Sequence, residues 1–118
     1  MSGAGLAATR TDAAGTGDAV VYEVNLDIDA DVIAAYRPWL DAHVAEICAL
    51  PGFTGARVFE VVEPAAADGR VALCVQYLLC NAAALDDYLA HHAARMRADG
   101  LARFGGRFHA SRRILRAA

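Results

Sequence analysis

The sequence contains no lysine, and arginine supplies all 11 of its basic side chains. Catalysis through a lysine Schiff base is therefore excluded. Serine is also scarce, because Ser2 and Ser111 are the only examples, and no G-x-S-x-G motif is present. The sequence accordingly argues against a serine hydrolase.

Several localisation and cofactor signals are missing as well. The three cysteines, Cys48, Cys74 and Cys80, lie in apolar segments without C-x-x-C spacing, which predicts reduced, buried thiols in a cytoplasmic protein. The sequence has no charged start followed by an apolar run, so nothing in it indicates export. No run approaches the roughly 18 apolar residues of a membrane helix. No glycine-rich phosphate loop follows a predicted strand, since Gly105-Gly106 precedes one.

Charge is divided unevenly along the chain. Residues 1–87 carry 13 acidic residues against 4 arginines, whereas residues 88–118 carry one acidic residue against 7 arginines. The later arginines alternate with apolar residues, so we expect ion pairs within the fold. The net charge of −3 also argues against nucleic acid as a partner.

A chain of 118 residues fits one domain. Residues 1–18 contain little that a core could bury and are predicted to be a disordered leader, with the domain over residues 19–116. The apolar fraction is 57%, above the usual value of about 45–50%, which suggests burial between subunits.

Hydrophobic periodicity predicts the secondary structure. Alternation over 20–28 is typical of a strand, and the segment 33–50 has the apolar arc of a helix, capped by Asp29 or Asp31 and ended by Pro51-Gly52. Pro38 either bends this helix or marks where its regular part starts; a bend is favoured because the apolar arc is continuous. The remaining predicted elements are strand 53–63, a hairpin loop over 64–69, strand 70–79, helix 82–99 ended by Gly100 and strand 107–115.

This β-α-β-β-α-β order predicts a ferredoxin-like α+β fold, a four-stranded antiparallel sheet with two helices on one face. The strand 70–79 is apolar on both faces, which indicates that both faces are covered. We therefore expect a homodimer that packs sheet against sheet.

Several motifs resemble an uncharacterised domain-of-unknown-function family of the ferredoxin-like dimeric α/β-barrel group. They span about Val20 to Leu115 and are W-x-x-x-H at 39–43, P-G-F-x-x-A-R at 51–57, Q-Y at 76–77, M-R at 96–97, and R-F-G-x-R-F with R-R-x-L over 103–115. Relatives in the group include cofactor-independent monooxygenases of antibiotic biosynthesis, haem-degrading enzymes, isomerases and dehydratases. The resemblance implies a ligand cavity between the helices and the sheet, but no catalytic residues.

His43 is the main candidate for chemistry. On an apolar helix face, one turn from Trp39, its imidazole could act as a general acid or base, or it could be a packing histidine; no orienting acid is obvious. His92, beside Tyr88 on the second helix, is expected to approach the same cavity. A metal held by His43 and His92 would lack a third ligand, so no metal is predicted.

Three further polar residues lie among apolar neighbours. Arg57 is expected to share a strand face with Phe53, Phe59 and Val61, and Arg112 with Phe108 and Ile114. Each arginine could snorkel, form ion pairs or bind a ligand carboxylate. Ion pairing is favoured, with Arg112 or Arg113 beside Glu23 or Asp27. The amide of Gln76 needs a partner in a ligand, a dimer mate or a neighbouring strand.

The leading hypothesis is a cofactor-free enzyme that oxygenates, isomerises or dehydrates a hydrophobic organic molecule. His43 would move a proton and Trp39 would pack the substrate, with Arg57, Gln76, Tyr88 and His92 as further substrate-binding residues. The alternative is a non-catalytic structural or ligand-binding dimer. Haem binding is the least favoured, because the placement of Asn25, Trp39 and His43 does not match that of the haem-degrading relatives.

Overall fold

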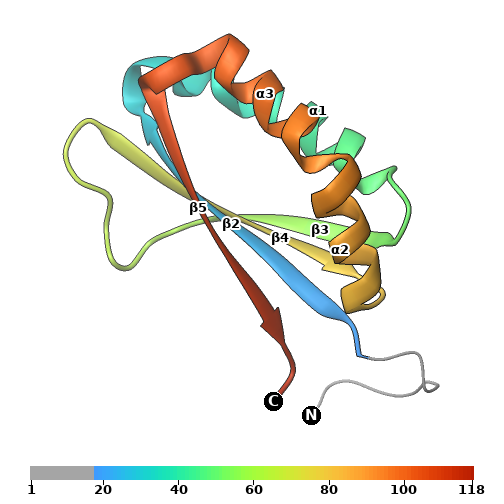
Figure 1. Ribbon diagram of the computed structural model, residues 1–118. Helices are drawn as coiled ribbons and strands as arrows, with labels where there is room; N and C mark the ends of the chain where they lie inside the picture. The colour runs from blue at the N-terminus through green and yellow to red at the C-terminus, as the bar shows by residue number, and fades with distance from the viewer. Residues whose placement is uncertain (1–17) are drawn as a thin grey trace.

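The computed structural model describes residues 18–118, so nearly all of the predicted leader lies outside the described residues. Four strands, β2 (Val20–Asp29), β3 (Phe53–Glu60), β4 (Arg70–Leu79) and β5 (Phe108–Arg116), form one sheet in the order β3-β4-β2-β5. All three neighbouring pairs are antiparallel. The helices α1 (Ile33–Cys48), α2 (Ala82–His91) and α3 (Ala93–Phe104) all lie over one face (Figure 1). The predicted ferredoxin-like α+β fold is confirmed.

The hydrophobic core lies between the helices and the sheet face that they cover. Alternation along β2 directs Tyr22, Leu26 and Ile28 to this face, and each is at most 5% exposed. Their partners across the ladder, Tyr77, Leu73 and Val71, belong to the same face of β4. Burial of these side chains explains why period-2 alternation located β2 correctly.

The first helix has the predicted position. Asp29 caps the short 3₁₀ turn before it (Ala30–Val32), accepting a hydrogen bond from the backbone N–H of Asp31 at 3.0 Å. The helix runs through Pro38, so the alternative that its regular part starts there is wrong. Gly52, which follows the helix, has φ +88°, and a Cβ atom there would lie 2.5 Å from Cβ of Ala84. A side chain at this turn would collide with α2.

The second predicted helix is wrong in two respects. It is divided at His92 into α2 and α3, and Gly100 does not end it, because α3 continues to Phe104. A Cβ atom on Gly100 would lie only 3.1 Å from the Trp39 ring and 3.2 Å from the Phe108 ring. This glycine permits close packing of α3, and Phe104 packs against Tyr36 with 4.8 Å between ring centroids.

Strand β3 differs from the prediction in its end and in its register. It stops at Glu60, and an irregularity between Phe53 and Gly55 shifts its pairing with β4. Phe53 packs against Tyr88 on the helix side, whereas Arg57 pairs with Gln76 on the other face. The prediction that Arg57 shares a face with Phe53 is therefore wrong.

The sheet face away from the helices, hereafter the open face, is not uniformly apolar. Neighbouring apolar residues Leu78, Val21 and Leu115 form one row across three strands. The next row is polar and centres on Glu23, which is only 3% exposed. Its carboxylate accepts hydrogen bonds from Arg113 at 2.7 Å, Asn25 at 2.9 Å and Gln76 at 3.0 Å. The predicted ion pair between the last and first strands is confirmed for Arg113.

The cysteines are free thiols, but their burial varies. Cys74 on β4 is buried and Cys48 is half-buried, whereas Cys80 is exposed. Cys80 follows the fully buried Leu79 at the end of β4, so it points away from the core. The expectation of three buried thiols is wrong for this residue.

Candidate functional site

A cavity of about 60 Å³ lies between α1, α3 and the helix-covered face of the sheet. It is called the helix-side pocket here. Its buried walls are aromatic and aliphatic, while half-buried His43 and exposed Arg97 and Arg112 also line it. The space exceeds the roughly 10–15 Å³ that one water requires, so it can hold a few waters or the polar head of a small molecule.

His43 and Trp39 form one wall of the pocket. They lie one helical turn apart on α1, and their rings stack with 4.5 Å between centroids and 21° between planes. Burial lowers the pKa of His43 below its ordinary value of 6.5, and the nearby charges of Glu46 and Asp99 oppose this effect. The imidazole is therefore neutral at pH 7 and can accept a proton.

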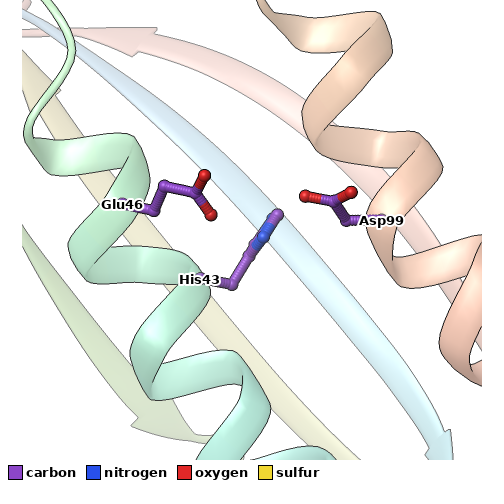
Figure 2. A group of neighbouring side chains, drawn as sticks. All are labelled: His43, Glu46 and Asp99. Carbon is purple, nitrogen blue, oxygen red and sulfur yellow. The ribbon is translucent and has the colours of Figure 1, made fainter.

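Two exposed carboxylates lie near the imidazole, although within residues 18–118 no hydrogen bond or ion pair joins either of them to His43. Figure 2 shows Glu46, from the same helix, and Asp99, from α3, directed toward the His43 ring. The nearest donor and acceptor atoms of these three residues lie within 4.8 Å of one another. Glu46 is one turn from His43 and could have been proposed from the sequence. Asp99 could not, because only the packing of α3 beside α1 brings it there.

Among the described residues, His43, Glu46 and Asp99 are the group that could hold a divalent cation. Zinc ligands at about 2.0–2.2 Å from the metal are roughly 3.3–3.6 Å apart, so these side chains would have to move closer together. His92 is not part of the group. It lies at the junction of α2 and α3, does not line the pocket, and has Nδ1 3.4 Å from an Arg95 nitrogen.

Tyrosines form much of the inner wall. Tyr36, Tyr77 and Tyr88 are 1%, 3% and 3% exposed, and all three line the pocket. Tyr22 lines it too, and its hydroxyl oxygen accepts a hydrogen bond from Arg97 at 2.9 Å. Burial raises the pKa of Tyr36 and of Tyr88 to about 12, so both hydroxyls keep their protons at neutral pH.

The structure brings together only some of the residues predicted from sequence, and the prediction that His92 approaches the same cavity is wrong. His43, Trp39 and Tyr88 meet in the helix-side pocket. Arg57 and Gln76 lie on the open face, where Arg57 covers the Phe59 ring at 5.2 Å and Gln76 donates to Glu23. They cannot contact a ligand in the pocket of the same chain.

Arg97, Tyr22, Tyr36 and Tyr77 line the pocket, although the sequence predicts no ligand-binding role for them. Arg112 has no ion-pair partner among residues 18–118 and lines the pocket, although ion pairing was favoured for it. The sequence places Arg112 on the strand face of Phe108 and Ile114 and leaves the binding of a ligand carboxylate open for it. Arg97 carried a weaker signal, the M-R pair at 96–97.

Comparison with known protein families identifies the family of this chain. The family described as "Domain of unknown function (DUF4286)" matches residues 19–118. The chain belongs to this family. The resemblance inferred from its motifs is therefore confirmed, and no match to a curated protein was found for this DUF4286 member.

Solved structures share the fold at low sequence identity. SnoaB from Streptomyces nogalater, described as a cofactor-independent oxygenase, matches in a mutant form with a TM-score of 0.62 and 14% identity, over 86% of this chain and 94% of SnoaB. Rv0793 from Mycobacterium tuberculosis matches with a TM-score of 0.62 and 20% identity, over 86% and 96%. The de novo designed protein Foldit4 matches with a TM-score of 0.56 and 10% identity, over 86% and 100%. Since a designed protein is among them, these likenesses establish architecture and not activity.

Within residues 18–118, no helix combines the length and the apolar character needed to cross a membrane.

Proposed function

We propose that this DUF4286 protein binds a hydrophobic organic molecule in the helix-side pocket and acts on it without a cofactor, most simply as a monooxygenase. His43 is the general base and acid of this proposal. The supporting observation is a neutral imidazole that lines the pocket with two carboxylates within 4.8 Å of it. The shared fold with SnoaB, described as a cofactor-independent oxygenase, supports the reaction class.

In the proposed reaction, His43 removes a proton from an acidic C–H or O–H of the substrate. Asp99 and Glu46 stabilise the resulting imidazolium, and general base catalysis of this kind contributes typically about 10²–10⁴-fold. The substrate anion then donates electrons to O₂ and forms a C–O bond. The peroxide takes a proton and loses water, so a CH₂ group and O₂ become a carbonyl and H₂O. Isomerisation or dehydration would begin with the same proton transfer.

The size of the cavity restricts how a substrate can bind. Pockets for drug-sized ligands commonly enclose about 300–1,000 Å³, whereas this cavity is about 60 Å³. Only the reacting end of a substrate would enter it, and the remainder would lie against Trp39 or require that ring to move. The same small volume favours the second candidate, a non-catalytic dimer whose pocket is filled by its own side chains.

We also propose that a second copy covers the open face. Leu78 and Phe59 are 43% and 37% exposed there, and large apolar side chains on a sheet face favour association. The polar row around Glu23 would lie inside such an interface. Its hydrogen bonds within the chain reduce the cost of that burial.

Oxygen uptake with a panel of acidic hydroxynaphthalenes tests the enzymatic proposal. The wild-type protein should accelerate uptake by at least one compound, and His43→Gln should lose about 100-fold or more while keeping its melting temperature within a few degrees. His109→Gln is the matched control, because His109 is an exposed histidine on the open face. Equal rates for wild type and His43→Gln would contradict the role of His43. If no compound is turned over and the purified protein carries no bound molecule, the structural dimer is favoured.

A further inference from the structure

We infer that the helix-side pocket recognises the anionic oxygen head of its ligand, a carboxylate or an enolate or phenolate oxygen, through Arg112 and buried tyrosine hydroxyls. The premise that the pocket binds a ligand comes from the proposed function. The chemistry of the ligand, however, follows from a different set of residues than the chemistry of His43.

Buried hydroxyls without partners are the first observation. The structure provides no hydrogen-bond partner within residues 18–118 for the hydroxyls of Tyr36, Tyr77 and Tyr88, although each residue is at most 3% exposed. Buried polar groups are nearly always hydrogen-bonded, to protein, water or ligand. All three tyrosines line the cavity, so the partner of these donors belongs in that space.

The second observation is a positive charge beside these hydroxyls. Arg112 pairs with Val24 in the ladder, which places it on the helix-covered face of β5. It lines the same pocket as Tyr36 and Tyr88. Burial raises the pKa of both tyrosines, and the charge of Arg112 acts in the opposite direction on each. The next residue, Arg113, is neutralised by Glu23 on the open face. Arg112 has no such partner among residues 18–118 and remains available to an anion.

A further hydroxyl donor comes from Tyr22. Because its oxygen accepts the Arg97 hydrogen bond at 2.9 Å, its own proton is free to be donated to another acceptor. Arg97 thereby orients a hydroxyl in the wall of the pocket and adds a second positive charge. An arginine with several hydroxyl donors is the chemistry that binds a carboxylate or an oxyanion. The carboxylates of Asp99 and Glu46 lie instead beside His43 (Figure 2).

The volume fits this head group. About 60 Å³ accommodates a carboxylate or one anionic oxygen and its neighbouring atoms, but not a whole aromatic molecule. An aromatic body would therefore extend from the pocket along Trp39, whose ring already stacks on His43. The favoured ligand class is an aromatic acid or an acidic hydroxyaromatic compound.

Trp39 is the only tryptophan in the chain, so its fluorescence reports on this pocket alone. Benzoate and benzamide are suitable probes, because they have nearly the same shape and differ in charge. We expect benzoate to change the Trp39 emission saturably and to bind at least about tenfold more tightly than benzamide. Arg112→Gln should weaken benzoate binding by about tenfold or more and abolish the preference over benzamide. Arg57→Gln, which removes an arginine from the open face, should leave both affinities unchanged.

Tyr88→Phe gives an independent variant, because it removes one pocket hydroxyl and keeps the ring. It should weaken benzoate binding several-fold with little effect on benzamide. Equal affinity of wild type for the two probes, or unchanged benzoate affinity in both Arg112→Gln and Tyr88→Phe, would overturn the inference. A different result tests the proposed function. His43→Gln should keep its benzoate affinity and lose turnover, and full turnover by this variant would remove the role of His43 and leave anion recognition standing.

Discussion

At the scale of single residues, burial sets the protonation state of the pocket. His43 is half-buried, and desolvation of its charged form lowers its pKa below 6.5. The opposing charges come from Glu46 on α1 and Asp99 on α3, while Arg95 lies 4.0 Å from Glu46 and moderates its effect. The imidazole is thus neutral over most of the physiological range, as a base requires.

Asp99→Asn should lower the pKa of His43 further, because it removes one of the two charges that raise it. NMR titration of the His43 ring protons, assigned by comparison with His43→Gln, measures this shift. The acid limb of any His43-dependent rate should move to lower pH in the same variant. An unchanged or raised pKa in Asp99→Asn would show that the carboxylate does not act on the ring.

Burial of His43 also makes folding sensitive to pH. Because its folded pKa lies below 6.5, the unfolded chain binds the proton more readily, and stability is lost as the pH falls from about 6.5 toward the folded value. Urea unfolding across this pH range should show a smaller fall in the free energy of unfolding for His43→Gln than for wild type. If the free energy of unfolding changed equally with pH in the two proteins, the burial of a neutral imidazole would be contradicted.

Glu23 also makes the stability of the fold depend on pH, in a lower pH range than His43. Hydrogen bonds from Arg113, Asn25 and Gln76 lower its pKa from 4.5 to about 2. Its stabilising contribution is complete above about 4.5 and is lost as the pH falls toward 2. Glu23→Gln should cost about 1.5–3 kcal/mol at pH 7, since it removes charge-assisted hydrogen bonds from a buried position.

Urea denaturation of Glu23→Gln at pH 7 and pH 3 checks this contribution. The variant should differ from wild type less at pH 3 than at pH 7. Asp68→Asn is the control, because this aspartate lies in the exposed loop between β3 and β4. An equal loss of stability for the two variants at pH 7 would contradict the importance of the Glu23 network.

At the scale of secondary structure elements, local patterns predicted what local burial determines. Alternating side chains located β2, a run that is apolar on both faces located β4, and the apolar arc located α1. The failures have non-local causes. Gly100 resembles a helix stop in sequence, but it lies inside α3 where the Trp39 and Phe108 rings leave little room for a side chain. The irregularity near Thr54 reverses the face of Arg57, and no local signal marked it.

Gly100→Ala tests the packing between α3 and the pocket. Alanine favours a helix by about 1 kcal/mol over glycine, but its Cβ would lie 3.1 Å from the Trp39 ring and overpack the interface, which costs about 1–3 kcal/mol. We expect a net loss of up to about 2 kcal/mol in urea unfolding and a shifted Trp39 emission. A more stable protein with unchanged emission would show that the Trp39 and Phe108 rings move aside at little cost.

At the scale of the whole molecule, the helices cover one face of the sheet and leave the other without cover (Figure 1). The sequence predicted this layered fold but could not predict the composition of the helix-side pocket. That composition depends on which side chains from α1, α3 and β5 meet. His43 and Trp39 share one helix, so the sequence alone places them together, whereas Asp99 comes near them only through the packing of α3 beside α1.

The proposed sheet-to-sheet dimer predicts a response to charge on the open face. Leu78→Arg should shift sedimentation equilibrium from dimer toward monomer at micromolar concentration, because it buries an unpaired charge in the interface. Leu101→Arg is the matched control, since Leu101 is an exposed leucine on α3. A monomeric wild-type protein would contradict the proposed interface, as would a dimer that tolerates Leu78→Arg.

A crystal structure with bound benzoate, or with any hydroxynaphthalene that proves to be a substrate, tests the central claim most directly. We predict the anionic oxygen within hydrogen-bonding distance of Arg112 and a pocket tyrosine, the ring against Trp39, and His43 in reach of the substrate. A ligand on the open face, or a helix-side pocket that stays closed at saturating ligand, would contradict the account.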